Sequence, residues 1–320
     1  MKAIQANEFG DSSVLHLVEI DVPTPAAGEV RVKVAAAGVN PVEVYVRNGG
    51  YAAYTPDLPY VPGFDAAGVV DAVGADVSGL APGDRVFVAS QRTCTYAEYA
   101  VVAADAVQPL PEWVTFEQGA SLGIPGLAAH RALFSRGNLQ AGERVLVHGA
   151  SGAVGQLAVQ LAKSAGASVI GTAGSEAGLE AVRALGVQAL DHTDPGHYAA
   201  TLRLTGGAGV DLIVELLANQ NLVADFEALA MYGRIIVVGN RGSLDFNPRL
   251  LMGKDADVRG LANWNFPPDL RRAALADLSA GLADGSLVPL VGRVFPLAEA
   301  AQAQDHVMTS RAVGKVVLTV

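Results

Sequence analysis

The sequence predicts an α/β protein in which a mostly β domain accompanies a domain built on a doubly wound parallel sheet. At 320 residues the chain exceeds the size at which one hydrophobic core usually stops growing, so two domains are expected. The first hundred residues show short β-type segments separated by Pro and Gly. From about residue 124, apolar strands alternate instead with helical stretches, which is typical of a parallel sheet.

The β-type segments of the first domain are four short apolar runs. They are predicted at residues 14–20, 30–36, 68–73 and 85–89. The segment that begins at Pro41 follows Asn40, and Asn before Pro is a common start of a helix.

The alternating part of the chain supplies the parallel sheet. Its strands are predicted at residues 144–148, 168–172, 210–215 and 233–239, with a further strand at 258–262 at the sheet edge. An unpaired edge strand offers a surface to a two-fold partner, so we expect a homodimer or homotetramer.

Beyond Pro267 the pattern reads helix, strand, helix, strand and ends in the apolar run at 316–320. We expect this tail to return to the first domain. The domains are therefore predicted as 1–123 with 268–320, and 124–267, with the second inserted into the first.

The composition narrows the functional classes. With 51% hydrophobic residues and a net charge of −10, the chain should fold compactly and lack a large basic surface for duplex nucleic acid. The one cysteine, Cys94, excludes an intramolecular disulfide and a zinc site built from several cysteines, and fits a reducing compartment. No signal-peptide core and no apolar run of membrane-spanning length is present. We expect a cytoplasmic protein.

The strand at 144–148 runs into the glycine turn GASGAVG at residues 149–155, followed by a helix at 156–165. Small residues let a backbone approach phosphate groups, and the amide groups and dipole of a helix start attract them. Gly155 would let the helix pack closely on the strand. The arrangement predicts a dinucleotide pyrophosphate site, although the spacing is GxxGxxG rather than GxGxxG.

The end of the second strand favours NADP over NAD. An NAD site normally carries an acid there, whereas this chain has Gly171-Thr-Ala-Gly-Ser175. The Ser175 hydroxyl and nearby amides can instead accept a 2′-phosphate, with His192 and Arg311 as cationic helpers. An isolated His or Arg is also often a purely structural group, and Glu176 lies close in sequence.

Several segments together resemble the zinc-independent quinone oxidoreductases of the medium-chain dehydrogenase/reductase superfamily, of the zeta-crystallin type. The resemblance covers nearly the whole chain. It rests on residues 38–49 (GVNPVEVYVRNG), 82–86 (PGDRV), 146–155 (LVHGASGAVG), 217–219 (LAN) and 237–242 (VVGNRG).

The resemblance implies a GroES-like β domain with a Rossmann domain, NADPH as the hydride donor and a small-molecule quinone as acceptor, reduced in one-electron steps to semiquinones. Zinc-containing relatives use a Cys near the position of Asn40 and a Gly-His-Glu segment where this chain has Gly63-Phe-Asp65. Asp65 alone cannot assemble the usual ligand set, so no catalytic metal is expected. Without a Lewis acid, reduction of an electron-poor acceptor fits better than alcohol oxidation.

The resemblance also implies the site residues. Asn40 and Tyr45 carry the positions beside the nicotinamide or the acceptor, and Tyr51 is placed to hydrogen-bond a quinone oxygen. An alternative role for Asn40 is to cap the helix that begins at Pro41. An alternative role for the two tyrosines is packing at a domain edge.

The cofactor residues fall into three groups. The pyrophosphate group is Ser151, Gly152, Ala153 and Val154, and the adenosine-phosphate group is Gly174, Ser175, His192 and Arg311. The nicotinamide group is Tyr45, Asn221, Val238, Gly239, Asn240, Arg241, Leu261, Ala262 and Asn263. Asn219 competes with Asn221, and some quinone reductases carry Lys where this chain has Gly178, so selectivity for NADPH is expected to be modest.

Other functions remain open. An NADPH-dependent reductase of α,β-unsaturated aldehydes or ketones shares the zinc-free scaffold, and the acceptor pocket cannot be read from the sequence. The resemblance implies single-stranded RNA binding as a second activity, which the acidic composition and the lack of an aromatic and basic stripe disfavour. The phosphate loop argues against a purely structural role.

Overall fold

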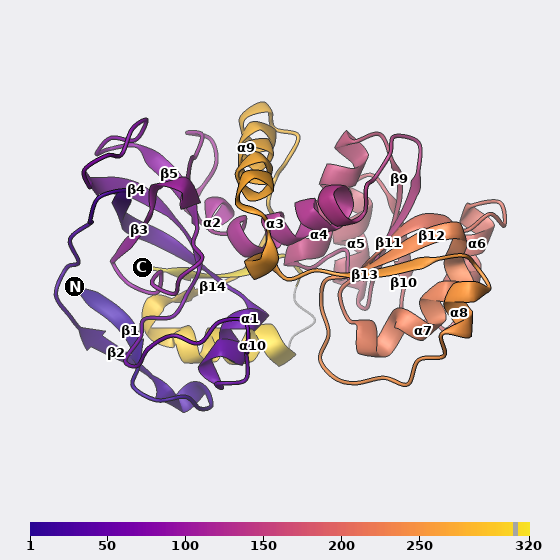
Figure 1. The fold of residues 1–320 in the computed structure, drawn as a ribbon, viewed down its shortest axis with the longest axis horizontal. Coiled ribbons are helices and arrows are strands. Elements are labelled where there is room, and N and C mark those ends of the chain that lie inside the picture. Colours follow the sequence, from indigo (N-terminus) through magenta and orange to yellow (C-terminus); the bar gives the residue numbers. More distant parts are fainter. Residues whose placement is uncertain (310–312) are drawn as a thin grey trace. The chain divides into compact units, whose positions relative to one another are not determined.

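The computed structural model describes residues 1–309 and 313–320. The chain divides into two compact units, one made of Met1–Pro125 with Leu275–Val320 and the other of Gly126–Ala274 (Figure 1). The divisions fall inside helices α3 (Gly123–His130) and α9 (Pro268–Asp284). No helix in the described part of the chain is long and apolar enough to cross a membrane.

The first unit is mostly β, as predicted. Its strands are β1 (Lys2–Ala6), β2 (Leu15–Glu19), β3 (Glu29–Val39), β4 (Asp65–Val73), β5 (Arg85–Ala89), β6 (Tyr99–Ala103), β7 (Val107–Pro109), β14 (Val291–Pro296) and β15 (Lys315–Thr319). The main sheet has the order β14-β15-β3-β4-β5-β7, with β6 also paired to β3, and β1 pairs with β2.

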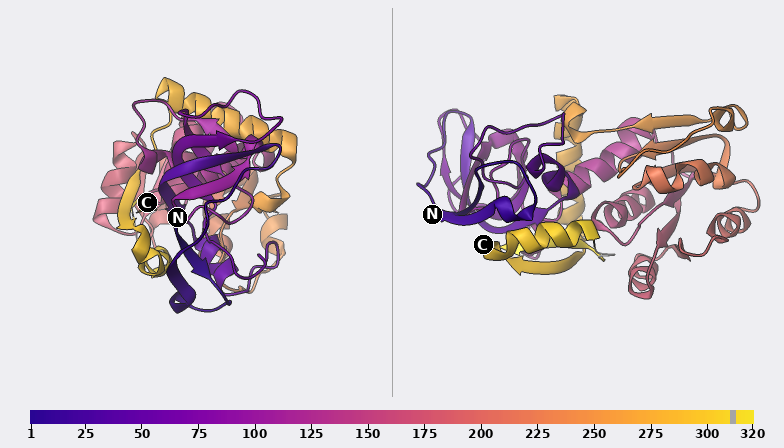
Figure 2. Two further views of the ribbon diagram at one scale, coloured as in Figure 1. Left: turned by 90° about the vertical axis from the view of Figure 1, so that its left-hand side faces the viewer. Right: turned by 90° about the horizontal axis from the view of Figure 1, so that it is seen from below.

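The C-terminal segment belongs to this unit. β15 pairs antiparallel with β3, so that Val317 lies opposite Gly38. Helix α10 (Ala300–Thr309) packs against α1 (Pro41–Arg47), and Figure 2 shows the yellow C-terminal helix beside the indigo N-terminal segment. The remaining helical segments of the unit are α2 (Phe116–Gly119) and short 3₁₀ turns at Ser12–Val14, Ala104–Ala106 and Leu297–Glu299.

The second unit contains the predicted parallel sheet. Its strands are β8 (Arg144–Val147), β9 (Ser168–Ala173), β10 (Gln188–Asp191), β11 (Val210–Glu215), β12 (Leu229–Val237) and β13 (Asp257–Gly260). The order is β10-β9-β8-β11-β12-β13, and all the pairings are parallel. The order reverses between β8 and β11, and ligands of such sheets bind at this point, outside the carboxyl ends of the strands.

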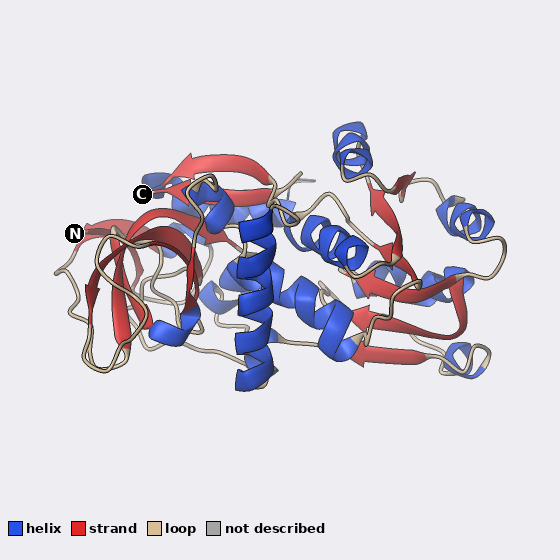
Figure 3. Cartoon of the chain, turned by 90° about the horizontal axis from the view of Figure 1, so that it is seen from above, coloured by secondary structure: helices blue, strands red, loops and turns tan. Residues whose placement is uncertain are grey.

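Helices lie on both sides of this sheet (Figure 3). They are α4 (Ala153–Ser164), α5 (Glu176–Ala184), α6 (His197–Leu204), α7 (Ala218–Ala228) and α8 (Arg249–Met252), with a π-helical turn at Arg131–Arg136 and a 3₁₀ turn at Asn263–Asn265. Tyr198 of α6 and Phe226 of α7 join Leu146 and Ile213 of the strands in one hydrophobic core. Burial of these apolar side chains on both faces stabilises the parallel sheet.

Some boundaries differ from the predicted ones. β12 starts at Leu229 rather than near residue 233 and is irregular, because Tyr232 has φ +61° and the register with β11 shifts. β3 extends to Val39, and two register irregularities in its pairing with β4 bend it. The edge strand β13 begins one residue before the predicted range and ends two residues before its predicted end.

Candidate active site

The glycine turn after β8 has the geometry of an anion site. Gly149 adopts φ +55°, a left-handed conformation that favours glycine, and Gly152 is the N-cap of the twelve-residue helix α4. A Cβ at Gly155 would clash with the Gly149 carbonyl and lie 2.6 Å from Ala150 Cα. Gly155 thus lets α4 start directly over the turn, with its free amide groups at the carboxyl edge of the sheet. Ser151 to Val154 lie in this turn and the first turn of α4.

The residues predicted to bind the adenosine phosphate, apart from Arg311, come together at the end of β9. A Cβ at Gly174 would clash with His192 Nε2 and lie 3.2 Å from its Cδ2, so the imidazole lies against the Gly174 backbone. Ser175 caps α5, with its Oγ accepting the Gly178 amide at 3.2 Å. A Cβ at Gly178 would lie 3.1 Å from Ser151 Oγ and 3.2 Å from Ser175 Oγ.

The acid nearest to this group in sequence has another partner. Glu176 is exposed, and its Oε1 pairs with Arg183 Nη1 at 2.8 Å along α5. Ser175, His192 and Gly174 therefore form a cluster of neutral and basic groups, whereas Arg311 lies outside the described residues.

The predicted nicotinamide residues follow β11 and β12. Asn221 Nδ2 donates to Glu215 Oε1 at 3.2 Å beneath the turn, and Asn219 accepts the Arg241 amide through Oδ1 at 2.9 Å. Asn240 Oδ1 accepts the Asn219 amide at 3.0 Å. Both asparagines thus stabilise the turn after β11. Asn221 binds it to Glu215, and Asn219 binds it to the loop after β12.

Backbone contacts position the other residues that were predicted to lie near the nicotinamide. The Val238 amide donates to the Glu215 carbonyl at 2.8 Å, and a Cβ at Gly239 would clash with the Leu216 carbonyl, so the two loops run in close contact. The Leu261 amide donates to the Val237 carbonyl at 3.1 Å.

Arg131 holds the next segment by donating to the carbonyls of Ala262 and Asn265. Residues 261–263 thus lie at the same edge as the other strand ends.

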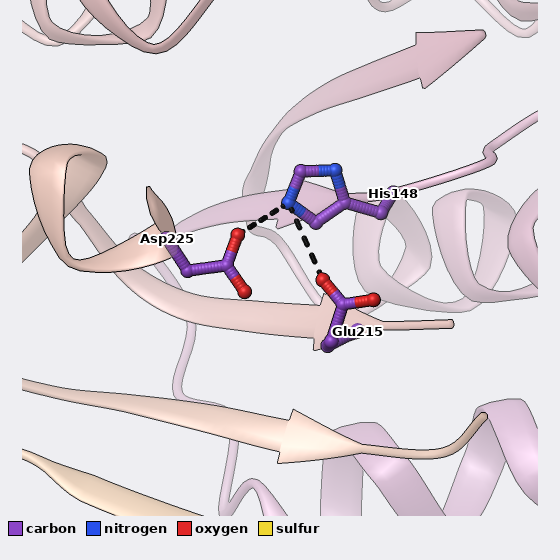
Figure 4. Close-up of side chains that lie close together, drawn as sticks. All are labelled: His148, Glu215 and Asp225. Carbon is purple, nitrogen blue, oxygen red and sulfur yellow. Dashed lines mark hydrogen bonds and ion pairs between the residues drawn. The ribbon is translucent and has the colours of Figure 1, made fainter. Parts of the chain in front are cut away.

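Sequence reasoning missed a buried cluster below this edge. His148 Nε2 lies 2.7 Å from Asp225 Oδ1 and 3.7 Å from Glu215 Oε2, and all three side chains are at most 3% exposed (Figure 4). Burial lowers the pKa of His148 and raises the pKa of Glu215 and that of Asp225 to about 7. The sequence feature that could have predicted this cluster is an ionisable residue at the end of each of two apolar strands, at positions 148 and 215.

Asn40 lies in a second buried cluster, in the first unit. Its Nδ2 donates to Glu43 Oε1 at 3.0 Å and to Asp65 Oδ2 at 2.9 Å, and its Oδ1 accepts Lys315 Nζ. Tyr96 donates its hydroxyl to Glu43 Oε2. Asn40 is 2% exposed, and both of its amide hydrogens are engaged inside the domain.

Lys315 is the cation of this cluster. Its ammonium lies 3.3 Å from Asp65 Oδ2, and the two side chains are 1% and 0% exposed. Burial lowers the pKa of Lys315 and raises the pKa of Asp65, while their attraction opposes both shifts. Gly38 makes room for the lysine, since a Cβ there would lie 2.9 Å from Lys315 Cε. Lys315 was not predicted, although a lysine opening an apolar strand was visible in the sequence.

The two tyrosines lie near Asn40 in sequence and are half-buried. Tyr45 belongs to α1, and its carbonyl accepts the Gly50 amide at 3.0 Å. Tyr51 lies in the following loop, and burial raises its pKa. Asn40 is the N-cap of α1, with Pro41 in the first turn and Glu43 Oε2 accepting the Asn40 amide at 3.1 Å.

The Asn40–Asp65 cluster does not suit a catalytic zinc ion. Asp65 Oδ1 accepts the Ile124 amide at 2.7 Å, and its Oδ2 accepts from Asn40 and Lys315. Zinc in proteins takes thiolate, imidazole and carboxylate ligands, whereas an amide, an ammonium and an engaged carboxylate meet here.

Comparison with known proteins identifies the family. The model described as "Alcohol dehydrogenase GroES-like domain" matches residues 26–112, and that described as "Zinc-binding dehydrogenase" matches residues 153–279. Quinone oxidoreductase of Rattus norvegicus is 43% identical over 99% of this chain and 97% of its own length, and that of Homo sapiens is 42% identical over the same shares.

Solved structures agree over both units. A quinone oxidoreductase of Pseudomonas syringae superposes with a TM-score of 0.89 at 29% identity, covering 100% of this chain and 99% of that one. A mycobacterial protein complexed with NADPH superposes with a TM-score of 0.89 at 29% identity, and the match covers 100% of both chains. The GroES-like and Rossmann architecture, the phosphate loop and the full-length identity together show that the chain is an oxidoreductase of the medium-chain dehydrogenase/reductase superfamily and belongs to its zeta-crystallin-type quinone oxidoreductases.

Proposed function

We propose that this protein reduces quinones with NADPH and without zinc. The observation that carries the cofactor assignment is the cluster at the end of β9, where His192 lies against Gly174 and Ser175 caps α5 while Glu176 is paired with Arg183. No carboxylate ends this strand to accept ribose hydroxyls, and a hydroxyl, helix amides and an imidazole suit a 2′-phosphate. The mycobacterial structure with NADPH and the quinone oxidoreductase relatives support the same assignment.

The nucleotide fits the residues of the second unit. Ser151 to Val154 would hold its pyrophosphate at the start of α4, and the loops after β11 and β12 would hold the nicotinamide half. When bound, it supplies a hydride to the acceptor. If semiquinone anions are the products, two quinones take up the two electrons of one hydride equivalent, and one proton is released.

The residues of the first unit supply orientation. We propose that Tyr45 lies beside the nicotinamide and that Tyr51 donates its hydroxyl to a quinone oxygen, since its raised pKa keeps it protonated at neutral pH. Asn40 acts as a positioning residue, because its amide hydrogens fix α1 to Asp65 rather than reaching outward.

The test compares acceptors and donors on purified protein. NADPH oxidation should be fast with 9,10-phenanthrenequinone and 1,4-benzoquinone, and electron spin resonance should detect the semiquinone. Activity with an α,β-unsaturated ketone alone would remove the quinone assignment. Equal affinity for NADH and NADPH would contradict the cofactor assignment.

A matched pair of variants tests the phosphate site. Ser175→Asp keeps a good helix cap but adds a negative charge, so the affinity for NADPH should fall on the order of tenfold or more while that for NADH is unchanged. Ser175→Asn, a neutral cap, is the control. An equal effect of Ser175→Asp on both nucleotides would show that Ser175 does not face a 2′-phosphate.

We further propose that the protein forms a homodimer or homotetramer through the edge of its parallel sheet. β13 ends the strand order, and in the described part of the chain its outer edge pairs with no other strand. Met231, Tyr232 and Met252 are exposed large apolar side chains in the same unit, at 53%, 74% and 74%. Light scattering should give twice or four times the mass of 32.8 kDa, and a monomer at micromolar concentration would refute this.

A further inference from the structure

The buried cluster of His148, Glu215 and Asp225 connects four elements of the second unit. His148 follows β8, Glu215 ends β11, and Asp225 lies on α7 (Figure 4). Tyr198 of α6 donates its hydroxyl to Asp225 Oδ1 at 3.2 Å. The cluster therefore lies where the two central strands of the sheet end.

On one side the cluster holds the turn after β11. Glu215 Oε1 accepts the Leu217 amide and also Asn221 Nδ2, the latter at 3.2 Å. This turn leads into the segment expected beside the nicotinamide half of the dinucleotide. A single carboxylate oxygen thus fixes its backbone and one of its side chains.

On the other side the cluster reaches the phosphate loop through Thr172 of β9. His148 Nδ1 lies 3.4 Å from Thr172 Oγ1, which accepts the Gly149 amide at 3.2 Å. The same hydroxyl lies 3.3 Å from His192 Nδ1, and the Thr172 carbonyl accepts the Ala150 amide at 2.7 Å. With His148 donating Nε2–H to Asp225, its Nδ1 accepts the Thr172 hydroxyl proton.

Each acid of the cluster keeps one carboxyl oxygen outside the hydrogen bonds described above. Glu215 Oε2 and Asp225 Oδ2 are buried and lack a hydrogen-bond partner in the described structure. Two adjacent buried carboxyl groups do not both ionise, and one shared proton would join these oxygens. One nitrogen or oxygen atom from each of His148, Glu215 and Asp225 lies within 4.8 Å of the others, a spacing that could hold a metal ion. Hydrogen bonds nevertheless account for the cluster, because His148 contacts Asp225 at 2.7 Å and Tyr198 donates to Asp225.

We propose that His148, Glu215 and Asp225 form a positioning unit that ties the phosphate loop to the turn after β11, so that the two halves of the dinucleotide site are held together. This inference rests on the proposed NADPH site. Since the tie runs through buried groups, disturbing it at the β11 end is transmitted to the phosphate loop.

Binding of separate halves of the cofactor tests this tie. Glu215→Leu removes the acceptor of Leu217 and Asn221, and calorimetry measures binding of NADPH, 2′,5′-ADP and reduced nicotinamide mononucleotide. We expect the affinity for 2′,5′-ADP, which does not touch the β11 turn, to fall about tenfold along with that for NADPH. Glu215→Gln keeps an acceptor oxygen and should restore both to within about threefold.

Two further variants separate positioning from loss of stability. Ile213→Ala creates a cavity in the same strand, at an apolar side chain that is 0% exposed and takes no part in the hydrogen bonds of the tie, so nucleotide affinity of the folded protein should stay within about threefold. Thr172→Val cuts the tie at β9 with almost no change of volume. It should lower the affinity for 2′,5′-ADP about fivefold and leave the affinity for reduced nicotinamide mononucleotide unchanged.

The outcomes are distinguishable. If Glu215→Leu lowers only the affinity for the nicotinamide mononucleotide, the tie does not exist. The same holds if Ile213→Ala lowers the affinity for 2′,5′-ADP as much as Glu215→Leu does. Should Glu215→Leu fail to fold, unchanged binding of 2′,5′-ADP to Thr172→Val would still overturn the inference. Absence of NADPH binding by the wild-type protein would instead refute the proposed function.

Discussion

Replacing Lys315 with Met tests the buried cluster of the first unit. The substitution conserves the volume of the aliphatic stem but removes the ammonium that faces Asp65 and Asn40. Asp65 is 0% exposed, so its carboxylate would be left in the interior without a cation. Removing one partner of a buried ion pair costs about 3–5 kcal/mol. We expect a loss of this size near neutral pH.

The loss should depend on pH in a defined direction. Attraction by Lys315 lowers the pKa of both Asp65 and Glu43, which burial raises. Without the ammonium, both values rise further, so the folded variant binds protons that the unfolded chain has released. Stability from a carboxyl group with a raised pKa is present at low pH and lost as the pH rises. The difference from wild type should therefore be larger at about pH 8 than at about pH 5.5.

Hydrogen exchange of the β3 and β15 amides measures the opening free energy of this unit directly, alongside urea unfolding followed by circular dichroism. Lys33→Met, an exposed substitution on β3, is the matched control and should change stability by less than about 0.5 kcal/mol. Adding Asp65→Asn to Lys315→Met removes both charges and should recover about half of the loss. A loss below about 1 kcal/mol at pH 8, or one independent of pH, would refute the reasoning.

Three further changes have defined outcomes. Gly155→Ala places a Cβ against the Gly149 carbonyl, so we expect a stability loss of about 1–3 kcal/mol and weaker NADPH binding in calorimetry; an unchanged Tm would contradict the close packing. Glu43 has its pKa raised from the ordinary 4.5 to about 7, so stability worth about 3 kcal/mol is lost as the pH rises through this range. Urea unfolding of Glu43→Gln should show a flatter pH profile, and an unchanged slope would be inconsistent with this. Tyr51→Phe should lower kcat/KM for quinones about tenfold in steady-state assays without changing the Kd for NADPH, whereas full activity would exclude the proposed hydrogen bond.

Local patterns were sufficient for most of the architecture. The strand, glycine turn and helix around residues 144–165 are local in sequence, and the left-handed conformation at Gly149 is one that glycine favours. The same holds for the capped start of α1 at Asn40 and Pro41. β10 (Gln188–Asp191) has no predicted range, because it lacks a run of β-branched residues. The early start of β12 depends on its irregular pairing with β11.

The sequence by itself determined the α/β class, and it predicted two domains, the return of the C-terminal strand and the strand ends where we propose that the nucleotide binds. These properties depend on hydrophobic periodicity and turn chemistry, which act over a few neighbouring residues. Only the tertiary structure decided the partners of buried charges. Lys315 meets Asn40 across 275 positions and Asp65 across 250, and His148 meets Asp225 across 77. Such pairs form because a buried charge must find a partner in space, and no local pattern specifies which one.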